Sequence, residues 1–516
     1  MILQVSRLAL LIIFLSPPSQ PAMNPTAAPQ LAAPDSTDVS NDTKTFTPEW
    51  AKGAVFYQIF PERFRNGDAS NDPAPDKKSP TAKSHPWTSN WYALTDAERA
   101  KSKNIYDHLT HRRYGGDMQG VLDKLDYLKD LGAQVIYFNP VFEAPSHHKY
   151  DASMFHHIDI NFGPDPKGDL EIMQREDAAR PETWQWTSAD KLFLKVVSEA
   201  HRRGMRVVID GVFNHVGRKF WAFDDLIANQ EKSRYKDWFI VTSWDNKAKG
   251  TTFDYKGWWN IRSLPEFRKD SVLGLAKGPR EHVFAATRRW MSPDGNRENG
   301  IDGWRLDVAN EVPHIFWKDW RKLVRSINPD AYISGELWDN AAQWLQGDEF
   351  DAVMNYPFAK LSVNYFIDKQ RKISASQFLD SLAQHLASYP DEVNHVLMNL
   401  FDSHDTDRLA SMILNPDRNY DRDATPRDNP KYVLRKPNAD ERQVQKLMAL
   451  FQMTYLGAPM LYYGTEAGMW SADDPDDRKP MLWPDLKYDD ESTETVNGDK
   501  AKYEVKFDQS LFDYHK

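Results

Sequence analysis

Arg305 and Asp307 are the two residues of this chain whose types and spacing most directly indicate chemistry. They stand two positions apart at the end of a short apolar run, so on a strand their side chains point to the same side. A guanidinium beside a carboxylate lowers the pKa of the carboxylate and keeps it ionised at neutral pH, as a nucleophile requires. Such a pair is more often a structural ion pair than a catalyst, so its meaning depends on the groups around it.

Acidic residues also follow three other predicted strands. Asp210 ends the third strand, Glu336 follows the fifth, and the pair His404-Asp405 follows the seventh. In a β/α barrel the catalytic groups lie at the C-terminal ends of the strands, so four such positions in chain order predict a single site.

The chemistry that fits these carboxylates is glycoside hydrolysis with retention. One ionised carboxylate attacks the anomeric carbon, while a protonated one donates to the leaving oxygen and then acts as a base toward water. Asp307 suits the nucleophile, and Glu336 suits the acid/base because partial burial and nearby negative charge favour its protonated form. Asp405 would hold the hydroxyls of the distorted sugar, and His215 and His404 would donate hydrogen bonds to them.

The elements that must position these residues alternate regularly along the chain. Eight short apolar runs are predicted strands, namely Ala54–Phe60, Val135–Asn139, Arg206–Gly211, Gly303–Leu306, Ala331–Gly335, Asp351–Met354, Val396–Phe401 and Met460–Tyr463. Apolar residues at helical spacing predict helices at Val121–Leu131, Ala189–Arg203, Arg280–Met291, Pro313–Val324, Ala375–Ala387 and Glu441–Tyr455. This alternation predicts an α/β fold, a (β/α)8 TIM barrel. A doubly wound open sheet is the alternative, but no glycine-rich phosphate loop follows the first strand.

The connection after the third strand, from about Phe213 to Lys277, is far longer than an ordinary loop and predicts an inserted subdomain. We therefore expect five parts along the chain. They are a signal peptide (1–22), a Pro-rich linker (23–48), the first part of the catalytic barrel (49–212), the inserted subdomain B (213–278) and the second part of the barrel (279–516), which ends within the last barrel helix.

Charge and the N-terminal residues limit the partners and the location. A net charge of -10 argues against nucleic acid as a partner, because phosphate binding needs a basic face. Arg7 precedes the apolar run Leu8–Leu15, which has signal-peptide length and is too short to span a bilayer. We therefore predict an exported protein, periplasmic or extracellular, with no membrane contact after cleavage. An uncleaved N-terminal anchor is the alternative.

The segments at the strand ends resemble the conserved regions of the α-amylase superfamily, glycoside hydrolase family 13. Further segments that carry the resemblance are Val55–Phe64, Asn139–Glu143, His148–Asp151 and Gly457–Glu466. The resemblance is greatest to the neopullulanase, cyclomaltodextrinase and maltogenic amylase branch. In that branch, the conserved region that contains the nucleophile ends in residues similar to Val308–Glu311. Ser263–Phe267 matches the Met-Pro-Lys-Leu-Asn signature of that branch only in part.

The resemblance implies a role for each matching residue. It implies Asp307 as the nucleophile, Glu336 as the acid/base and Asp405 as the stabiliser of the transition state. It also implies that Arg305, His215 and His404 position the substrate, with Asp210 orienting Arg305. Tyr150 would stack under the sugar that is cleaved. Glu311 would lie near the aglycone side, and Arg478 would contact the donor-side sugars.

A loop after the first predicted strand is rich in oxygen-bearing side chains, which suit calcium. On spacing alone, a solvated turn is the better interpretation. The resemblance reverses this preference, because it implies a structural Ca²⁺ ion held by Asn66, Asp68, Asn71, Asp72, Gly115 and Asp117.

Residues and resemblance together predict a retaining hydrolase of α-1,4-glucosidic bonds in starch-derived oligosaccharides, cyclodextrins or pullulan. A 4-α-glucanotransferase and a non-catalytic glucan-binding barrel are the alternatives. The branch usually carries an N-terminal β-sandwich and a C-terminal β domain. Neither is expected in this chain, so we predict a monomer with an open cleft.

Overall fold

The computed structural model describes residues 45–73 and 84–516. The predicted signal peptide, and the predicted linker up to residue 44, lie outside the described residues.

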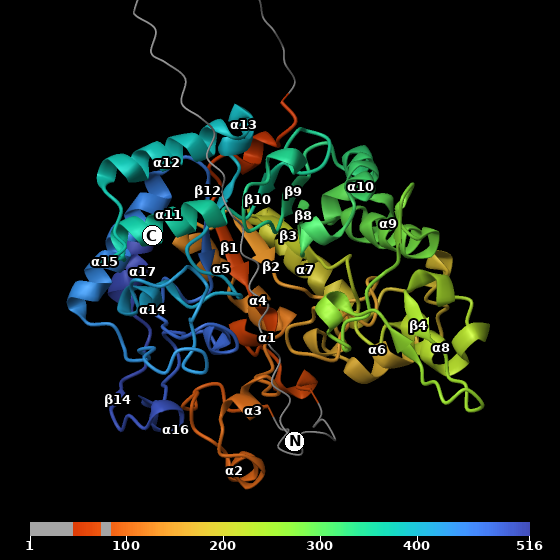
Figure 1. Cartoon of the computed structure of the whole chain (residues 1–516), viewed down its shortest axis with the longest axis horizontal. Coiled ribbons are helices and arrows are strands. Elements are labelled where there is room, and N and C mark those ends of the chain that lie inside the picture. The colour runs from red at the N-terminus through yellow and green to blue at the C-terminus, as the bar shows by residue number, and fades with distance from the viewer. Residues whose placement is uncertain (1–44, 74–83) are drawn as a thin grey trace, which may run out of the picture. The chain divides into compact units, whose positions relative to one another are not determined.

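Eight parallel strands form the centre of the molecule (Figure 1). They are β1 (Phe56–Ile59), β2 (Val135–Phe138), β3 (Arg206–Gly211), β8 (Gly303–Leu306), β9 (Tyr332–Gly335), β10 (Ala352–Val353), β11 (Met398–Asn399) and β12 (Ala458–Tyr462). Their order in the sheet is β10-β9-β8-β3-β2-β1-β12-β11, and a parallel bridge between Met354 and Met398 joins the two ends. The sheet is therefore a nearly closed barrel, and the predicted TIM-barrel fold is confirmed.

Helices surround these strands (Figure 1). They include α4 (Met118–Asp123), α5 (Leu125–Leu131), α6 (Pro166–Met173), α7 (Ser188–Arg202), α9 (Lys277–Met291), α10 (His314–Ile327), α11 (Tyr356–Phe366), α12 (Ala375–Ala387), α15 (Ala439–Thr454) and α17 (Gln509–His515). Helix α7 shows why they form, because its buried residues recur on one face and the Thr187 hydroxyl caps its first turn. The predicted helix 121–131 is two helices, since the chain leaves helical geometry at Lys124 (φ -110°, ψ 7°).

The long segment between β3 and α9 folds beside the barrel, and its buried apolar residues belong to the same core as those of the barrel. It contains α8 (Trp221–Asn229) and two short antiparallel pairs, β4 (Val241–Ser243) with β5 (Asp254–Tyr255), and β6 (Lys269–Asp270) with β7 (Gly274–Leu275). The segment is rich in buried aromatic residues, with Phe223 packed edge-on against Phe239 and Tyr255. A backbone bridge between His215 and Glu266 brings this segment back over the end of β3.

Strand register places the chemically active residues at one edge of the barrel. Asp210 on β3 lies beside Arg305 on β8, and Leu306 on β8 lies beside Gly335 on β9. Because these three strands are in step, Asp307 and Glu336, which directly follow β8 and β9, leave the barrel at the same edge.

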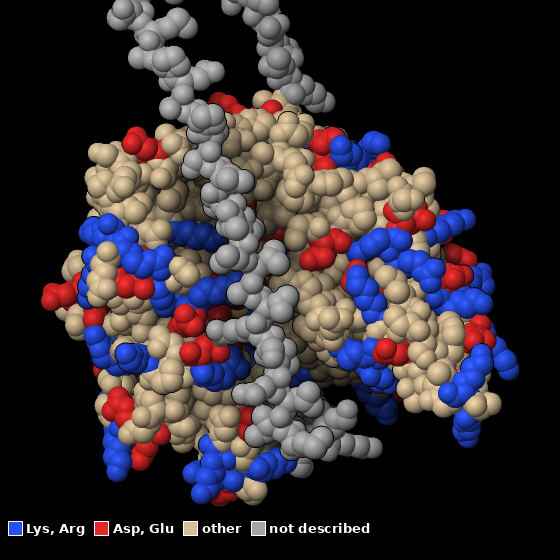
Figure 2. Space-filling model, viewed as in Figure 1, with Lys and Arg blue, Asp and Glu red and all other residues tan. Residues whose placement is uncertain are grey.

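The described surface carries charges of both signs. On the face shown in Figure 2, acidic and basic side chains are interspersed rather than gathered into one basic face, as the net charge led us to expect. Among the described helices, none has both the length and the apolar character that crossing a membrane requires.

Candidate active site

The Arg305 guanidinium is the centre of the site. It is fully buried, and its Nη1 lies 3.0 and 2.9 Å from the two carboxylate oxygens of Asp210. The same nitrogen lies 3.2 Å from Asp307 Oδ1, and Nη2 lies 2.9 Å from Glu336 Oε2. One guanidinium thus holds three carboxyl groups that come from three neighbouring strands.

Glu336 is fixed by two further donors. The Val308 N–H donates to Glu336 Oε2 at 3.1 Å, and Trp338 Nε1 donates to Glu336 Oε1 at 3.0 Å. Val308 has φ 38°, in the left-handed region that a β-branched residue rarely adopts. This conformation costs about 1–3 kcal/mol, and it aims the Val308 N–H at the carboxylate.

A second group of side chains lies around Asp405, in the loop after β11. His404 Nε2 lies 3.0 Å from Asp405 Oδ2, and Arg478 Nη2 lies 3.2 Å from Asp405 Oδ1. Arg478 also donates to the His404 carbonyl from Nε at 2.8 Å and from Nη2 at 2.6 Å. The Asp405 side chain is 32% exposed, compared with 8% for Asp307 and Glu336, so it faces the open side of the site.

Tyr150 connects the two groups. Its ring stacks on the His404 ring with centroids 5.4 Å apart and planes 5° apart, and its Oη donates to Asp210 Oδ2 at 3.0 Å. Asn139 Nδ2 in turn donates to Tyr150 Oη at 3.0 Å.

His215 lies next to Trp258, with the two rings stacked 4.9 Å apart. Its Nδ1 lies 3.2 Å from Asn214 Nδ2, whereas its buried Nε2 has no hydrogen-bond partner among the described residues. Burial, and secondarily the Lys269 ammonium, lower the pKa of His215 to about 3, so the ring is neutral. With Nδ1 as the acceptor, Nε2–H is a donor without an acceptor.

Glu311 stands apart from the carboxylate cluster. Its Oε1 accepts a hydrogen bond from Trp259 Nε1 at 3.3 Å, and the Trp259 side chain is one of the most exposed large apolar residues, at 74%.

The net shift at Asp307 differs from our expectation. We predicted that Arg305 would hold the pKa of Asp307 low. Burial instead raises the pKa of the Asp307 carboxyl well above its usual range, the Glu336 carboxylate adds to this shift, and Arg305 only opposes it. The prediction considered the ion pair alone, and burial was not visible in the spacing.

Several residues of the site were not predicted. Tyr137 donates to Asp210 Oδ2 at 2.9 Å, and Gln58 Nε2 donates to His404 Nδ1 at 2.8 Å. Both stand inside apolar strands, β2 and β1, and a polar residue in such a run is the signal that was available. Trp338, two residues after Glu336, is a third unpredicted residue of the site, because its indole Nε1 donates to Glu336 Oε1.

The predicted calcium ligands lie together in one loop region. Asn66 Nδ2 lies 2.7 Å from Asp72 Oδ1, and a Cβ on Gly115 (φ +77°) would lie 2.1 Å from that oxygen. The buried Asn71 Oδ1 has no partner among the described residues. The Asp68 side chain turns back to Ser70, whose N–H and hydroxyl donate to its Oδ1 at 2.9 and 2.6 Å.

Asp117 differs from the other predicted ligands. Its Oδ1 accepts from Gly67 N and Gly120 N, and its Oδ2 accepts from Asp68 N and Asn71 Nδ2, at 2.6–3.1 Å. Four donors occupy its two oxygens, so it organises the loop around Asn71.

Comparison with known proteins gives consistent matches. A family model described as "Alpha amylase, catalytic domain" matches residues 58–177 and 187–510. Neopullulanase 2 of Thermoactinomyces vulgaris is 40% identical over 438 residues, which are 85% of this chain and 60% of that protein. The ligand-free cyclic alpha-maltosyl-(1→6)-maltose hydrolase of Arthrobacter globiformis has a TM-score of 0.65 and 30% identity, with 91% of this chain and 82% of that chain covered. This chain spans less than two thirds of the length of the curated relatives.

The prediction of export is contradicted by a further relative. The "Intracellular maltogenic amylase" of Bacillus subtilis (strain 168) is 37% identical over 445 residues, which are 86% of this chain and 60% of that protein. Secretion to the periplasm or the medium is therefore not supported. The prediction relied on the length and polarity of one apolar run, residues 8–15, which lies outside the described residues.

Proposed function

Because the chain belongs to the α-amylase family, glycoside hydrolase family 13, we propose that it is a retaining α-glucan hydrolase. Its substrates would be α-1,4-linked oligosaccharides derived from starch, cyclodextrins or pullulan. One observation carries the proposal: Asp307 and Glu336 lie 3.2 and 2.9 Å from the two terminal nitrogens of a single buried guanidinium. Contact of both carboxyl groups with one guanidinium favours the short separation, about 5–5.5 Å, that a retaining mechanism uses.

The proposed reaction has two steps. In the first, Asp307 attacks the anomeric carbon, the glycosidic C–O bond breaks, and Glu336 gives its proton to the leaving oxygen. In the second, Glu336 takes a proton from water, whose oxygen attacks the anomeric carbon and releases Asp307. The product keeps the α configuration because the two displacements each invert it.

The mechanism needs a proton on Glu336 and a charge on Asp307 at the same moment. Four carboxyl groups, those of Asp210, Asp307, Glu336 and Asp405, meet the guanidinium groups of Arg305 and Arg478 at this site. Burial raises the pKa of Asp210, Asp307 and Asp405, which favours retention of protons by the cluster. Carboxyl groups this close share their protons. The proposed mechanism requires one such proton at the leaving oxygen, while Arg305 stabilises the ionised Asp307.

The surrounding groups would hold the sugar. The unpartnered Nε2–H of His215 is a free donor for a hydroxyl, and the exposed edge of Asp405 is an acceptor. The Tyr150 ring offers an aromatic face at the centre of the site, of the kind that stacks against sugar rings.

The test is a product analysis of the purified protein with maltotriose, α-cyclodextrin and pullulan, in which NMR follows the anomeric configuration of the first product. We expect shorter glucans whose new reducing end is α. A first product in the β form, or no turnover of any of these glucans, would refute the proposal. Products longer than the substrate at high maltotriose would identify a glucanotransferase instead.

The pH dependence provides a further prediction. Burial and the Glu336 carboxylate raise the pKa of Asp405 to about 7, and the Arg478 guanidinium opposes them. Because ionised Asp405 accepts hydrogen bonds with both oxygens and its negative charge stabilises the positive charge that develops on the sugar, kcat/KM for maltotriose should fall as the pH drops below about 7. In Arg478→Met the acid limb should move to higher pH. A limb at the same pH in both proteins would contradict the role of Asp405.

We also propose that the loop around Asn71 binds one Ca²⁺ ion. The donor set is all oxygen, which suits calcium, and the orphaned Asn71 Oδ1 and the Asp72 carboxylate beside Gly115 are suitable ligands. Asn66 would become a third ligand if its side-chain amide rotated so that its oxygen, rather than its nitrogen, lay next to Asp72. Asp117 would not bind the ion but would position Asn71 through its hydrogen bond to Asn71 Nδ2.

Removing calcium should therefore destabilise the protein. With EGTA the Tm should fall, and excess Ca²⁺ should restore it, because an ion at 100 times its Kd stabilises the native state by about 2.7 kcal/mol. Differential scanning calorimetry would measure this effect. In Asn71→Ala the response should disappear, whereas the exposed Asn340→Ala should respond like the parent. A response that persists in Asn71→Ala would place the calcium elsewhere.

A further inference from the structure

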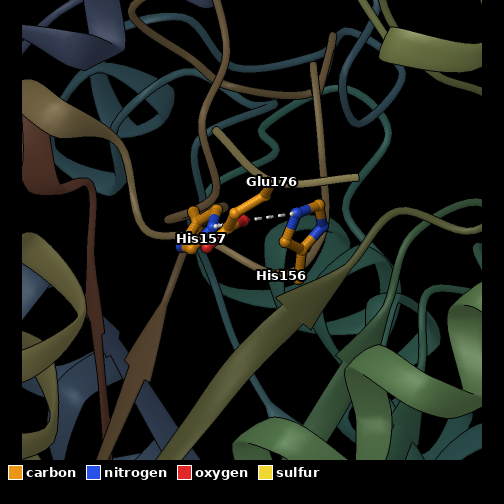
Figure 3. A group of neighbouring side chains, drawn as sticks. All are labelled: His156, His157 and Glu176. Carbon is orange, nitrogen blue, oxygen red and sulfur yellow. Dashed lines mark hydrogen bonds and ion pairs between the residues drawn. The ribbon is translucent and has the colours of Figure 1, made fainter. Parts of the chain in front are cut away.

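A second cluster of ligand-type side chains lies away from the carboxylates. His156 and His157, in the loop after β2, meet Glu176, which follows α6 (Figure 3). Glu176 Oε2 lies 2.8 Å from His157 Nε2 and 3.7 Å from His156 Nε2. All three side chains are buried, at 1% exposure or less.

The surrounding hydrogen bonds orient two of these ligands. His157 Nδ1 lies 2.7 Å from Asp190 Oδ2, and Asp190 is itself held by Ile158 N at 2.8 Å and Arg289 Nη2 at 3.0 Å. A carboxylate behind an imidazole fixes the tautomer whose other nitrogen faces a metal. Glu176 Oε1 accepts the Gln185 N–H, so Oε2 is the oxygen that faces the two rings.

His156 has no comparable partner. Its ring stacks on Trp184 at 4.2 Å, its Nδ1 has no hydrogen-bond partner among the described residues, and its Nε2 is too far from Glu176 for a hydrogen bond. A ligand at Nε2, the nitrogen that faces Glu176, would give this buried ring a polar partner.

We propose that His156, His157 and Glu176 bind one Zn²⁺ ion. Four-coordinate zinc takes imidazole nitrogen and carboxylate oxygen at about 2.0–2.2 Å, so its ligand atoms stand about 3.3–3.5 Å apart. The two distances to Glu176 Oε2, 2.8 and 3.7 Å, lie on either side of that spacing, and the three ligand atoms lie within 4.8 Å of one another. Zinc would take the place of the proton that His157 shares with Glu176, and water would complete the tetrahedron.

The ion would have a structural effect. It would join the stretch that follows α6 to the loop after β2, and Asp190 would extend the link to the first turn of α7. The loop after β2 also carries Tyr150, so the site would brace one wall of the proposed active site. The family match covers residues 58–177, which include all three proposed ligands, and is interrupted only at residues 178–186.

The test uses the full chain, freed of metal, saturated with Ca²⁺ and then titrated with Zn²⁺. Bound metal is measured by mass spectrometry of the elements, and Co²⁺ is added in a parallel sample for its visible absorption. We expect one zinc per chain, a four-coordinate cobalt spectrum and a rise in Tm with zinc. Glu176→Gln should weaken zinc binding at least about 100-fold, because it removes a ligand rather than a partner of a ligand.

Asp177→Asn is the matched control, since Asp177 is the next residue, carries the same charge and faces Arg234 instead of the cluster. It should bind zinc like the parent. His156→Gln is the second variant, to be used in the same titration if Glu176→Gln does not fold. No stoichiometric zinc in the parent protein, or equal zinc affinity in the parent and either ligand variant, would overturn the proposal.

Discussion

Asp307→Asn should lower kcat for maltotriose hydrolysis by at least about 10⁴-fold, because an amide cannot form the glycosyl ester on which the proposed reaction depends. The amide fills nearly the same volume as the carboxyl, so the fold should persist. Glu336→Gln should lower kcat by about 10²–10⁴-fold, since it removes a general acid and not the nucleophile. Asp391→Asn, whose side chain is 93% exposed in the parent, should keep full activity as the control.

A substrate with a good leaving group separates the two roles. Fluoride leaves α-maltosyl fluoride without needing a proton from Glu336. Glu336→Gln should therefore still release fluoride in a first turnover, whereas Asp307→Asn should not. Rapid fluoride release by Asp307→Asn, or full maltotriose hydrolysis by either variant, would contradict the proposed mechanism.

Arg305→Met should remove both stability and activity. The guanidinium is fully buried and lies within 3.2 Å of three carboxyl groups, so its loss leaves buried negative charge unpaired. Breaking a buried ion pair by removing one partner costs about 3–5 kcal/mol. Arg305→Lys keeps the charge but lacks the planar guanidinium that contacts all three carboxyl groups. Its stability should therefore lie between that of the parent and that of Arg305→Met.

The loss in Arg305→Met should depend on pH, with a sign that follows from the carboxyl groups. Burial already raises the pKa of Asp210 and of Asp307, and the guanidinium opposes both shifts. Without it, both groups titrate at still higher pH, and a carboxyl whose pKa is higher in the folded state loses stability as the pH rises through that value. In urea unfolding, the free energy of unfolding of Arg305→Met should therefore fall below that of the parent by less at pH 5 than at pH 8. An equal deficit at both would contradict this account.

The parts that could be predicted from the sequence were those with a local signal. Each barrel strand is a short apolar run, and the acids at the strand ends fall together because β3, β8 and β9 are in step. Helices α6 and α11 were not predicted, since α6 has few apolar residues and α11 has a Pro in its first turn, which was interpreted as a break. The split at Lys124 depends on packing rather than on periodicity.

The electrostatics of the site could be predicted only in part. The sequence places Arg305 beside Asp307, but the depth of burial comes from residues far along the chain, and burial decides the direction of the shift. Tyr137 on β2 contacts Asp210 on the neighbouring β3, and Gln58 on β1 contacts His404 in the loop after β11, so these contacts join residues far apart in the sequence. The zinc candidate was missed for the same reason, because His157 and Glu176 are separated by helix α6.

The crowding of carboxyl groups around Arg305 implies a trade-off between turnover and robustness. Asp307, Glu336 and Asp405 repel one another, and that repulsion is part of the reason why the pKa values of Asp307 and Asp405 are raised. Replacing Asp307 by a neutral isostere relieves it, so the variant that loses catalysis should melt at a higher temperature than the parent. Effects of substitutions at these positions should also fail to add, because each changes the charge that the others experience. Stabilised variants selected for heat resistance alone would therefore accumulate neutral residues at the positions that catalysis needs charged.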